Sequence, residues 1–101
     1  MRRIYISGKI TGDDNYKKKF EAATKALLKF FDNKVAVFNP AMLDLGPDAT
    51  WEHYIRKDVQ MLCTCDTIYM LSDWKKSKGA RFERKIAKKL GIEIVYERRR
   101  R

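Results

Sequence analysis

Histidine and cysteine are scarce in this chain of 101 residues, which contains one histidine and two cysteines. Cys63 and Cys65 with a single histidine make a poor set of ligands for a metal ion. We therefore expect no metal site and no cofactor. Two buried, reduced thiols where a helix meets a strand are the better interpretation, because cytoplasmic proteins keep cysteines reduced.

Long hydrophobic runs are also missing. No apolar stretch approaches the roughly 20 residues that a membrane-spanning helix needs. The apolar run that follows Arg3 is too short for the core of a signal peptide. These absences predict a cytoplasmic protein without membrane contact. With no internal repeat and no linker, residues 1–97 are expected to form a single domain, followed by a basic tail at 98–101.

Basic residues are abundant, because 23 Lys and Arg outnumber 13 Asp and Glu and give a formal net charge of +10. Such a balance favours an anionic partner, either a phosphate-bearing small molecule, a nucleic acid or an acidic surface. The four arginines at 98–101 are typical of a solvated tail. Binding of nucleic acid through this tail is not favoured, since the lysines are spread over helix backs instead of being gathered with aromatic residues.

Apolar segments rich in β-forming residues alternate with amphipathic segments along the chain. Strands are predicted at 4–7, 35–38, 67–71 and 92–96, and helices at 15–31, 51–62 and 79–90. Strands that are apolar throughout and alternate with helices indicate a parallel sheet covered on both faces. The predicted fold class is therefore α/β, a small, doubly wound parallel sheet of about four strands.

In such a sheet, ligands bind beyond the carboxyl ends of the strands. The loop after the first strand brings backbone N–H groups and polar side chains to this edge, with the sequence Gly8, Lys9, Ile10, Thr11, Gly12. Its spacing fits neither a P-loop nor a dinucleotide fingerprint. Contact with a phosphate and a simple tight turn are both open interpretations. The second strand is stopped by Asn39 and Pro40, where the next loop of this edge begins.

The loop after the third strand leads into a helix that Ser77 is placed to cap. Gly79 permits close approach of the backbone, and the N-terminus of a helix attracts anions. Trp74 in the same loop is a candidate for stacking on a base, or alternatively a cover for the edge of the core.

Glu83 stands on the inward stripe of the third helix, three and four residues before Ile86 and Ala87. A carboxylate there is costly unless it is paired or functional. Its place near the start of the helix should favour the ionised form, which suits a nucleophile or base. A salt bridge to a neighbouring Lys or Arg is the alternative.

Two further residues have alternative interpretations. Asp58 sits beside the apolar stripe of the second helix, where pairing with Arg56 or Lys57 is the alternative to a role in the site. Tyr5 in the first strand is expected to pack in the core.

The ordered combination of these residues resembles the nucleoside 2-deoxyribosyltransferase superfamily, and in particular its small, often phage-encoded DUF4406 branch. The matching positions fall in four groups along the chain. They are residues 4–8 with Ile10 and Gly12, the pair Asn39 and Pro40, the aspartates Asp58 and Asp66, and the Ser-x-Gly-Ala-x-x-Glu motif formed by Ser77, Gly79, Ala80 and Glu83. The resemblance implies a flavodoxin-like fold and cleavage of an N-glycosidic bond at the sugar C1′. It also implies Glu83 as nucleophile, Tyr5 in contact with it, and Asp58 as an assistant to the base or sugar.

One difference within the superfamily bears on the ligand. Transferases that act on free nucleosides carry an aspartate at the position of Ser77, whereas relatives that hydrolyse nucleoside monophosphates carry a serine that contacts the 5′-phosphate. The resemblance therefore favours hydrolysis of a (deoxy)nucleoside 5′-monophosphate. Transfer of the deoxyribosyl group and a non-catalytic nucleotide-binding or sensing module are the alternatives. A homo-oligomer, dimer or tetramer, is also expected from the resemblance.

Overall fold

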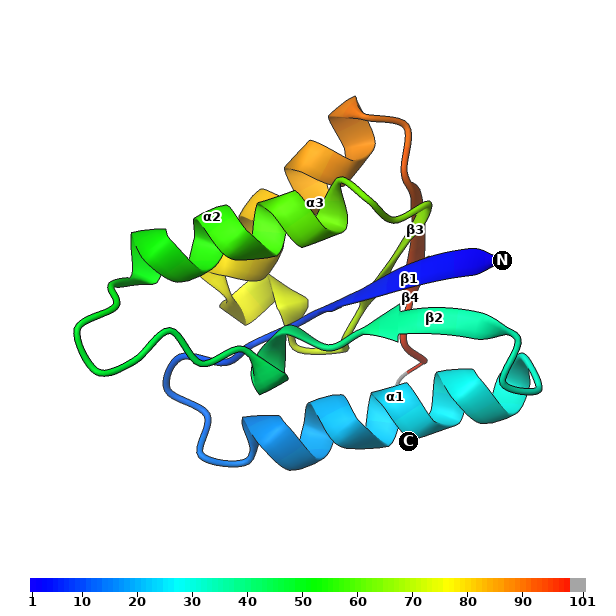
Figure 1. The fold of residues 1–101 in the computed structure, drawn as a ribbon, viewed down its shortest axis with the longest axis horizontal. Coiled ribbons are helices and arrows are strands. Elements are labelled where there is room, and N and C mark those ends of the chain that lie inside the picture. Colours follow the sequence, from blue (N-terminus) through cyan, green and yellow to red (C-terminus); the bar gives the residue numbers. More distant parts are fainter. Residues whose placement is uncertain (99–101) are drawn as a thin grey trace.

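The computed structural model describes residues 1–98, so the predicted basic tail lies almost wholly outside the described residues. The chain forms one sheet of parallel strands in the order β2-β1-β3-β4, with a helix in each connection (Figure 1). The elements are β1 (Arg2–Ser7), α1 (Tyr16–Phe30), β2 (Val35–Phe38), η1 (Pro40–Met42), α2 (Trp51–Leu62), β3 (Thr67–Met70), η2 (Trp74–Lys76), α3 (Lys78–Lys89) and β4 (Glu93–Tyr96). The predicted α/β class with a parallel sheet is confirmed.

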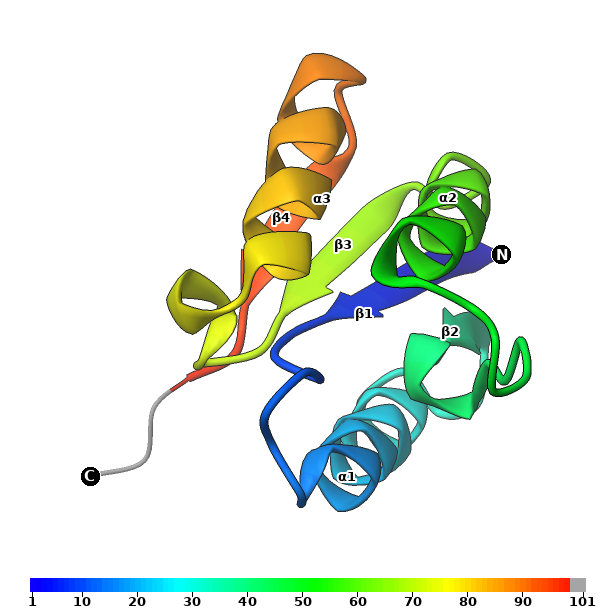
Figure 2. The ribbon, with the colours of Figure 1, turned by 90° about the vertical axis from the view of Figure 1, so that its left-hand side faces the viewer.

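Helices cover both faces of the sheet. Helix α1 lies on one face, and α2 and α3 lie together on the other (Figure 2). Because successive side chains of a strand point to opposite faces, Ile4 and Ile6 pack toward α1 while Tyr5 packs with α2 and α3. The sheet is doubly wound, as the alternating pattern predicts.

Strand β1 occupies the position where the strand order reverses, since its connection leads to β2 on one side while β3 lies on the other. Ser7, the last residue of β1, pairs in register with Met70, the last residue of β3. The loops that follow these strands therefore leave the same edge of the sheet side by side. This edge is where a ligand site is expected in an open α/β sheet.

Side-chain caps fix the elements that border this edge. The Thr50 hydroxyl accepts a hydrogen bond from the His53 amide, and the His53 ring accepts one from the Thr50 amide, which together begin α2. The Ser77 hydroxyl accepts from the Ala80 amide and begins α3 at Lys78. Asn39 caps η1 in the same way. The predicted cap at Ser77 is confirmed.

Burial differs from expectation at the ends of helices. Cys65 is buried as predicted, but Cys63, the residue that caps the C-terminus of α2, is exposed. Phe30 and Leu90 extend the apolar stripes of α1 and α3, yet they are 80% and 57% exposed. Both stand at the ends of their helices, where the stripe continues beyond the core that it covers.

No helix within residues 1–98 is both long enough and apolar enough to cross a membrane.

Candidate active site

A cavity of about 560 Å³ opens at the carboxyl edge of the sheet, between the loop after β1, helix α2 and the start of α3. That volume lies within the range of small-molecule sites. Most of the residues singled out in the sequence line it, namely Tyr5, Gly8, Lys9, Ile10, Thr11, Asp58, Ser77, Gly79, Ala80 and Glu83. Gly12, Asn39 and Trp74 are not among the lining residues.

Glu83 is held at the buried wall of this cavity. Its side chain is 4% exposed on α3. The Tyr5 hydroxyl donates to Oε2 at 2.8 Å, and the Ser7 hydroxyl donates to Oε1 at 2.7 Å. Within residues 1–98 no lysine or arginine forms an ion pair with Glu83. The salt-bridge alternative is therefore wrong, and the contact between Tyr5 and Glu83 that the resemblance implies is present.

The burial of Glu83 works against the expected ionised form. Burial raises the pKa of Glu83 to about 8, and the nearby Asp58 raises it further, against the hydrogen bonds from Ser7 and Tyr5 that lower it. Desolvation of a carboxylate outweighs its favourable place near a helix N-terminus. The surroundings of Glu83 therefore favour the protonated acid more than those of an exposed carboxyl group do.

Asp58 is the second buried carboxyl group of the cavity. It is 9% exposed, and its Oδ1 atom has no hydrogen-bond partner among the described residues. Burial raises the pKa of Asp58 to about 7. Pairing with Arg56 or Lys57 is therefore wrong, because Asp58 turns inward while its basic neighbours on the helix are exposed. A buried polar atom without a partner calls for an explanation, and a ligand in the cavity that Asp58 lines would supply one.

Tyr5 remains a hydrogen-bond donor in this environment. Its ring is completely buried, with 0% exposure, on the face of β1 that packs against α2 and α3. Burial raises the pKa of Tyr5 well above its ordinary value, and the adjacent Glu83 adds to this effect. The phenol is therefore protonated across the physiological range and donates to Glu83.

The aromatic wall of the cavity comes from α2. Trp51, Tyr54, Ile55 and Asp58 all line it, which is the spacing of one helix face. Trp74 lies elsewhere, with its ring 5.9 Å from that of Tyr96, so the structure does not bring it to the cavity. The apolar stripe of α2 can be recognised in the sequence. That part of this stripe lines a cavity instead of the core cannot.

Cationic groups line the cavity on the loop after β1 and around the start of α3. Lys9, Lys76 and Lys78 line it together with Ser77, and the Lys78 ammonium lies 4.2 Å from the centre of the Trp51 ring. Because the Ser77 hydroxyl uses its oxygen to accept from Ala80, its hydrogen is free for a ligand. These groups with the N-terminus of α3 make this side of the cavity suited to an anion. The contribution of Lys76 and Lys78 was not predicted.

The backbone structure explains why two residues of the first loop are glycines. A Cβ atom on Gly8 would lie 2.7 Å from the Leu71 side chain, so only glycine allows the loop after β1 to pack against the end of β3. Gly12 has φ +78°, in the left-handed region that favours glycine. The tight-turn interpretation therefore accounts for both, although Gly8 also lines the cavity.

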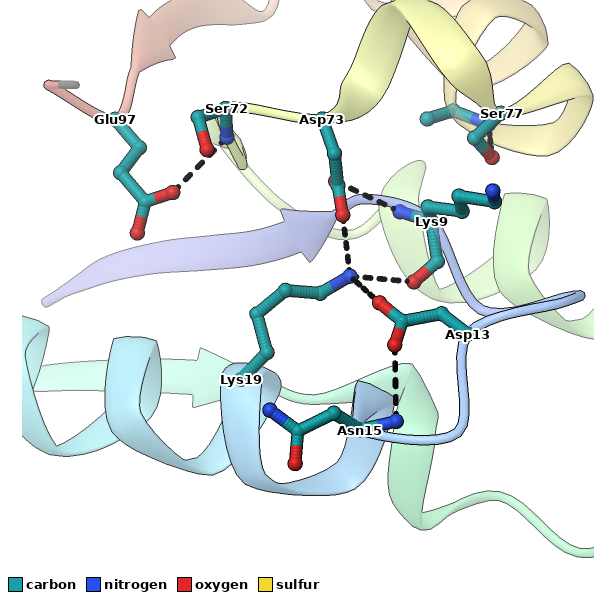
Figure 3. Close-up of polar contacts among 9 residues, drawn as sticks. Lys9, Asp13, Asn15, Lys19, Ser72, Asp73, Ser77 and Glu97 are labelled. Atoms are coloured by element: carbon teal, nitrogen blue, oxygen red, sulfur yellow. Dashed lines mark hydrogen bonds and ion pairs between the residues drawn. The ribbon is translucent and has the colours of Figure 1, made fainter.

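A lysine clamp joins the loops that border the cavity (Figure 3). The Lys19 ammonium binds the carboxylates of Asp13 and Asp73, and it donates to the Lys9 carbonyl at 2.8 Å. Asp73 also accepts from the Lys9 amide at 3.1 Å. The clamp thus fixes the backbone of Lys9 while leaving its side chain on the side of Ser77 (Figure 3).

Replacing Lys19 by methionine is expected to destabilise the protein by about 1–3 kcal/mol, because it leaves two half-buried carboxylates without their cation. Urea unfolding followed by circular dichroism measures this change. Lys25→Met is the matched control, since Lys25 pairs with Glu21 on the exposed surface of α1 and should lose about 0.5 kcal/mol or less. Equal losses in the two variants would show that the clamp contributes no more than a surface pair.

The fold is similar to three solved structures. A 2-desoxiribosyltransferase from Leishmania mexicana matches with a TM-score of 0.71 and 20% identity, over 95% of this chain and 63% of that chain. A conserved protein from Enterococcus faecalis V583 matches with a TM-score of 0.73 and 19% identity, over 95% and 62%. A 2-deoxyribosyltransferase from Bacillus psychrosaccharolyticus matches with a TM-score of 0.65 and 16% identity, over 93% and 70%. The chain thus spans less than two thirds of the first two.

The chain therefore has the α/β fold seen in 2-deoxyribosyltransferases. Residues 2–96 match the family DUF4406, a domain of unknown function, and the chain belongs to this family. No curated protein sequence matches it. Membership of DUF4406, inferred from the motifs, is confirmed, and the closer likeness to nucleotide hydrolases stays a prediction.

Proposed function

We propose that the protein is an enzyme that hydrolyses the N-glycosidic bond of a (deoxy)nucleoside 5′-monophosphate, with Glu83 as nucleophile. The observation that carries this proposal is the placement of Glu83, which is buried, free of any cationic partner within residues 1–98, and held by two hydroxyl donors at a cavity of nucleotide size. A carboxylate so placed suits attack at a carbon that becomes electron-poor in the transition state.

In the proposed reaction the ionised Glu83 carboxylate forms a bond to C1′ while the bond from C1′ to the base nitrogen breaks. The electron pair of that bond goes to the base, and Asp58 supplies the proton that the base takes up. The reacting state therefore carries its proton on Asp58 and not on Glu83. Because the pKa of Glu83 is raised to about 8 and that of Asp58 to about 7, this state is the less populated of the two singly protonated forms of the pair. Water then attacks C1′, the ester bond to Glu83 breaks, and the carboxylate is restored. Asp58 accepts the proton of the water and returns to its starting state.

The cationic side of the cavity supports a phosphate on the ligand. Lys9, Lys76, Lys78 and Ser77 lie there, at the start of α3. The aromatic side formed by Trp51 and Tyr54 suits a nucleobase. A nucleotide would then span the cavity, with its sugar beside Glu83. A homo-oligomer, dimer or tetramer, in the cytoplasm belongs to the same proposal.

Ser77→Asp is expected to lower kcat/KM for a deoxynucleoside monophosphate about 100-fold, because it sets a carboxylate against the phosphate. Aspartate caps helices as well as serine does, so α3 should remain intact. Release of free base from the monophosphate and from the matching nucleoside, followed by chromatography, gives the two rates. Ser72→Asp is the control, because Ser72 is exposed and does not line this cavity. An equal loss for both substrates in Ser77→Asp would contradict a phosphate subsite.

Transfer of the deoxyribosyl group to a second base is the other candidate activity. It is supported by the structural likeness to proteins named as 2-deoxyribosyltransferases. The two activities share the first step and differ in whether water or a base takes the sugar from Glu83. Adding a second free base to the same assay separates them, since transfer yields a new nucleotide and hydrolysis yields the sugar phosphate alone.

A further inference from the structure

Ser7 is the second residue that holds Glu83, and the predicted set of site residues did not include it. It ends β1, is 1% exposed, and donates its hydroxyl hydrogen to Glu83 Oε1 at 2.7 Å. Ser7 and Tyr5 are two residues apart on one strand, so their side chains point to the same face of the sheet. Each of them donates to a different oxygen of the same carboxyl group.

The two donors are not equivalent with respect to the cavity. Tyr5 and Glu83 line the cavity, whereas Ser7 is not among its lining residues. Oε1 is thus bound to a residue that does not line the cavity, whereas Oε2 is bound to one that does. A carboxylate oxygen that accepts one hydrogen bond still has a second lone pair available.

We propose that Ser7 is a positioning residue that anchors Oε1 of Glu83 to the sheet and so leaves Oε2 as the oxygen that meets the ligand. The proposal rests on the proposed function for its catalytic consequence. When Oε2 bonds to C1′, Oε1 becomes the carbonyl oxygen of the ester and keeps the Ser7 hydrogen bond. When water cleaves the bond between C1′ and Oε2, the electron pair returns to a carboxylate that Ser7 already stabilises.

The hydrogen bond from Ser7 also governs how readily Glu83 ionises. Burial is the dominant influence and raises the pKa of Glu83, whereas the Ser7 hydroxyl is the strongest influence that lowers it. The other groups that act on this carboxyl are Asp58 on α2, which raises the pKa, and Tyr5 on β1, which lowers it. The lysines that line the cavity form no ion pair with Glu83 within residues 1–98.

Ser7→Ala tests the proposal, because it removes the donor with almost no change in volume. The titration of Glu83 is followed by carbon NMR of protein labelled at glutamate side-chain carboxyls, with the resonance assigned from Glu83→Gln. Loss of one hydrogen bond to a charged acceptor should move the titration midpoint upward by about one pH unit or more. Ser7→Thr, which keeps the hydroxyl, should return the midpoint toward that of the wild type.

Rates of base release give a second readout. Ser7→Ala should be slowed about tenfold or more on the acidic limb of the pH profile, where ionisation of Glu83 limits the rate, and less above its midpoint. If the rate of Ser7→Ala fell by the same factor at every pH, the substitution would have distorted the site without changing the ionisation of Glu83. An unchanged titration midpoint in Ser7→Ala would overturn the proposal. The titration needs no turnover, so it decides the role of Ser7 even where the proposed hydrolysis fails.

Discussion

Glu83→Gln is expected to slow base release from a deoxynucleoside monophosphate by about 10⁴-fold, because an amide cannot form the ester with C1′. Glutamine preserves the volume of the side chain and can still accept from Tyr5 or Ser7, so the cavity should keep its shape. Binding of the nucleotide, measured by calorimetry, should therefore change little. Quantifying free base by chromatography under single-turnover conditions measures the chemical step.

Glu52→Gln is the matched control for this experiment, since Glu52 is an exposed glutamate in the first turn of α2. It should release base at the wild-type rate. If Glu83→Gln retained more than about one-tenth of the wild-type rate, Glu83 would not be the nucleophile. If wild type and Glu83→Gln both bound the nucleotide without releasing base, the cavity would serve binding alone.

Stability is expected to fall by several kcal/mol as the pH rises from 5 to 8.5. The pKa of Glu83 is raised from its ordinary 4.5 to about 8, so between these values the folded chain holds a proton that the unfolded chain releases. The stabilisation is complete below the unfolded pKa and is lost as the pH rises through the folded one, at up to about 1.4 kcal/mol per unit. The pKa of Asp58, raised from 3.8 to about 7, adds to the same trend.

Urea unfolding across this pH range measures the effect. Glu83→Gln should show a shallower decline and exceed the wild type in free energy of unfolding at pH 8.5, because it has no carboxyl group to ionise in the core. Glu52→Gln should run parallel to the wild type. Parallel curves for wild type and Glu83→Gln would mean that Glu83 titrates near its ordinary pKa, contrary to its burial.

The arrangement of strands and helices could be predicted because local and global signals agree. The apolar segment at 67–70 forms a largely buried strand and that at 35–38 a partly buried one, and Thr50 and Ser77 cap the helices that the periodicity predicts. At the helix ends the pattern says less, since Phe30 and Leu90 are apolar and yet exposed, where the stripe continues beyond the core. Periodicity describes which face is apolar but not how far the sheet extends beneath it.

The site could be predicted in part. The inward place of Glu83 follows from its spacing on α3, and its contact with Tyr5 follows from the family resemblance. The protonation state of Glu83 does not follow from the sequence. Desolvation, which raises its pKa, depends on the whole surrounding fold, and here it exceeds the effect of the helix N-terminus.

Other parts of the site could not be predicted from the sequence. The choice between Trp51 and Trp74 depends on the path of two loops, since each residue begins a helical turn that follows a loop. The Lys19 clamp joins residues that are 54 positions apart, which no local pattern reveals. The sequence did offer one indication that Ser7 belongs to the site, since it shares a strand face with Tyr5. A small polar residue at the end of a strand, however, usually has only a structural role.

The most direct test of Glu83 as the nucleophile is an acid-quenched time course on wild type and Glu83→Gln with a deoxynucleoside monophosphate. Free base is measured by chromatography and the intact protein by mass spectrometry. We expect free base in the wild type, a deoxyribose-phosphate adduct that maps to the peptide containing Glu83, and neither product in Glu83→Gln. Base release at equal rates in both proteins, or in neither of them, would contradict the proposed role of Glu83.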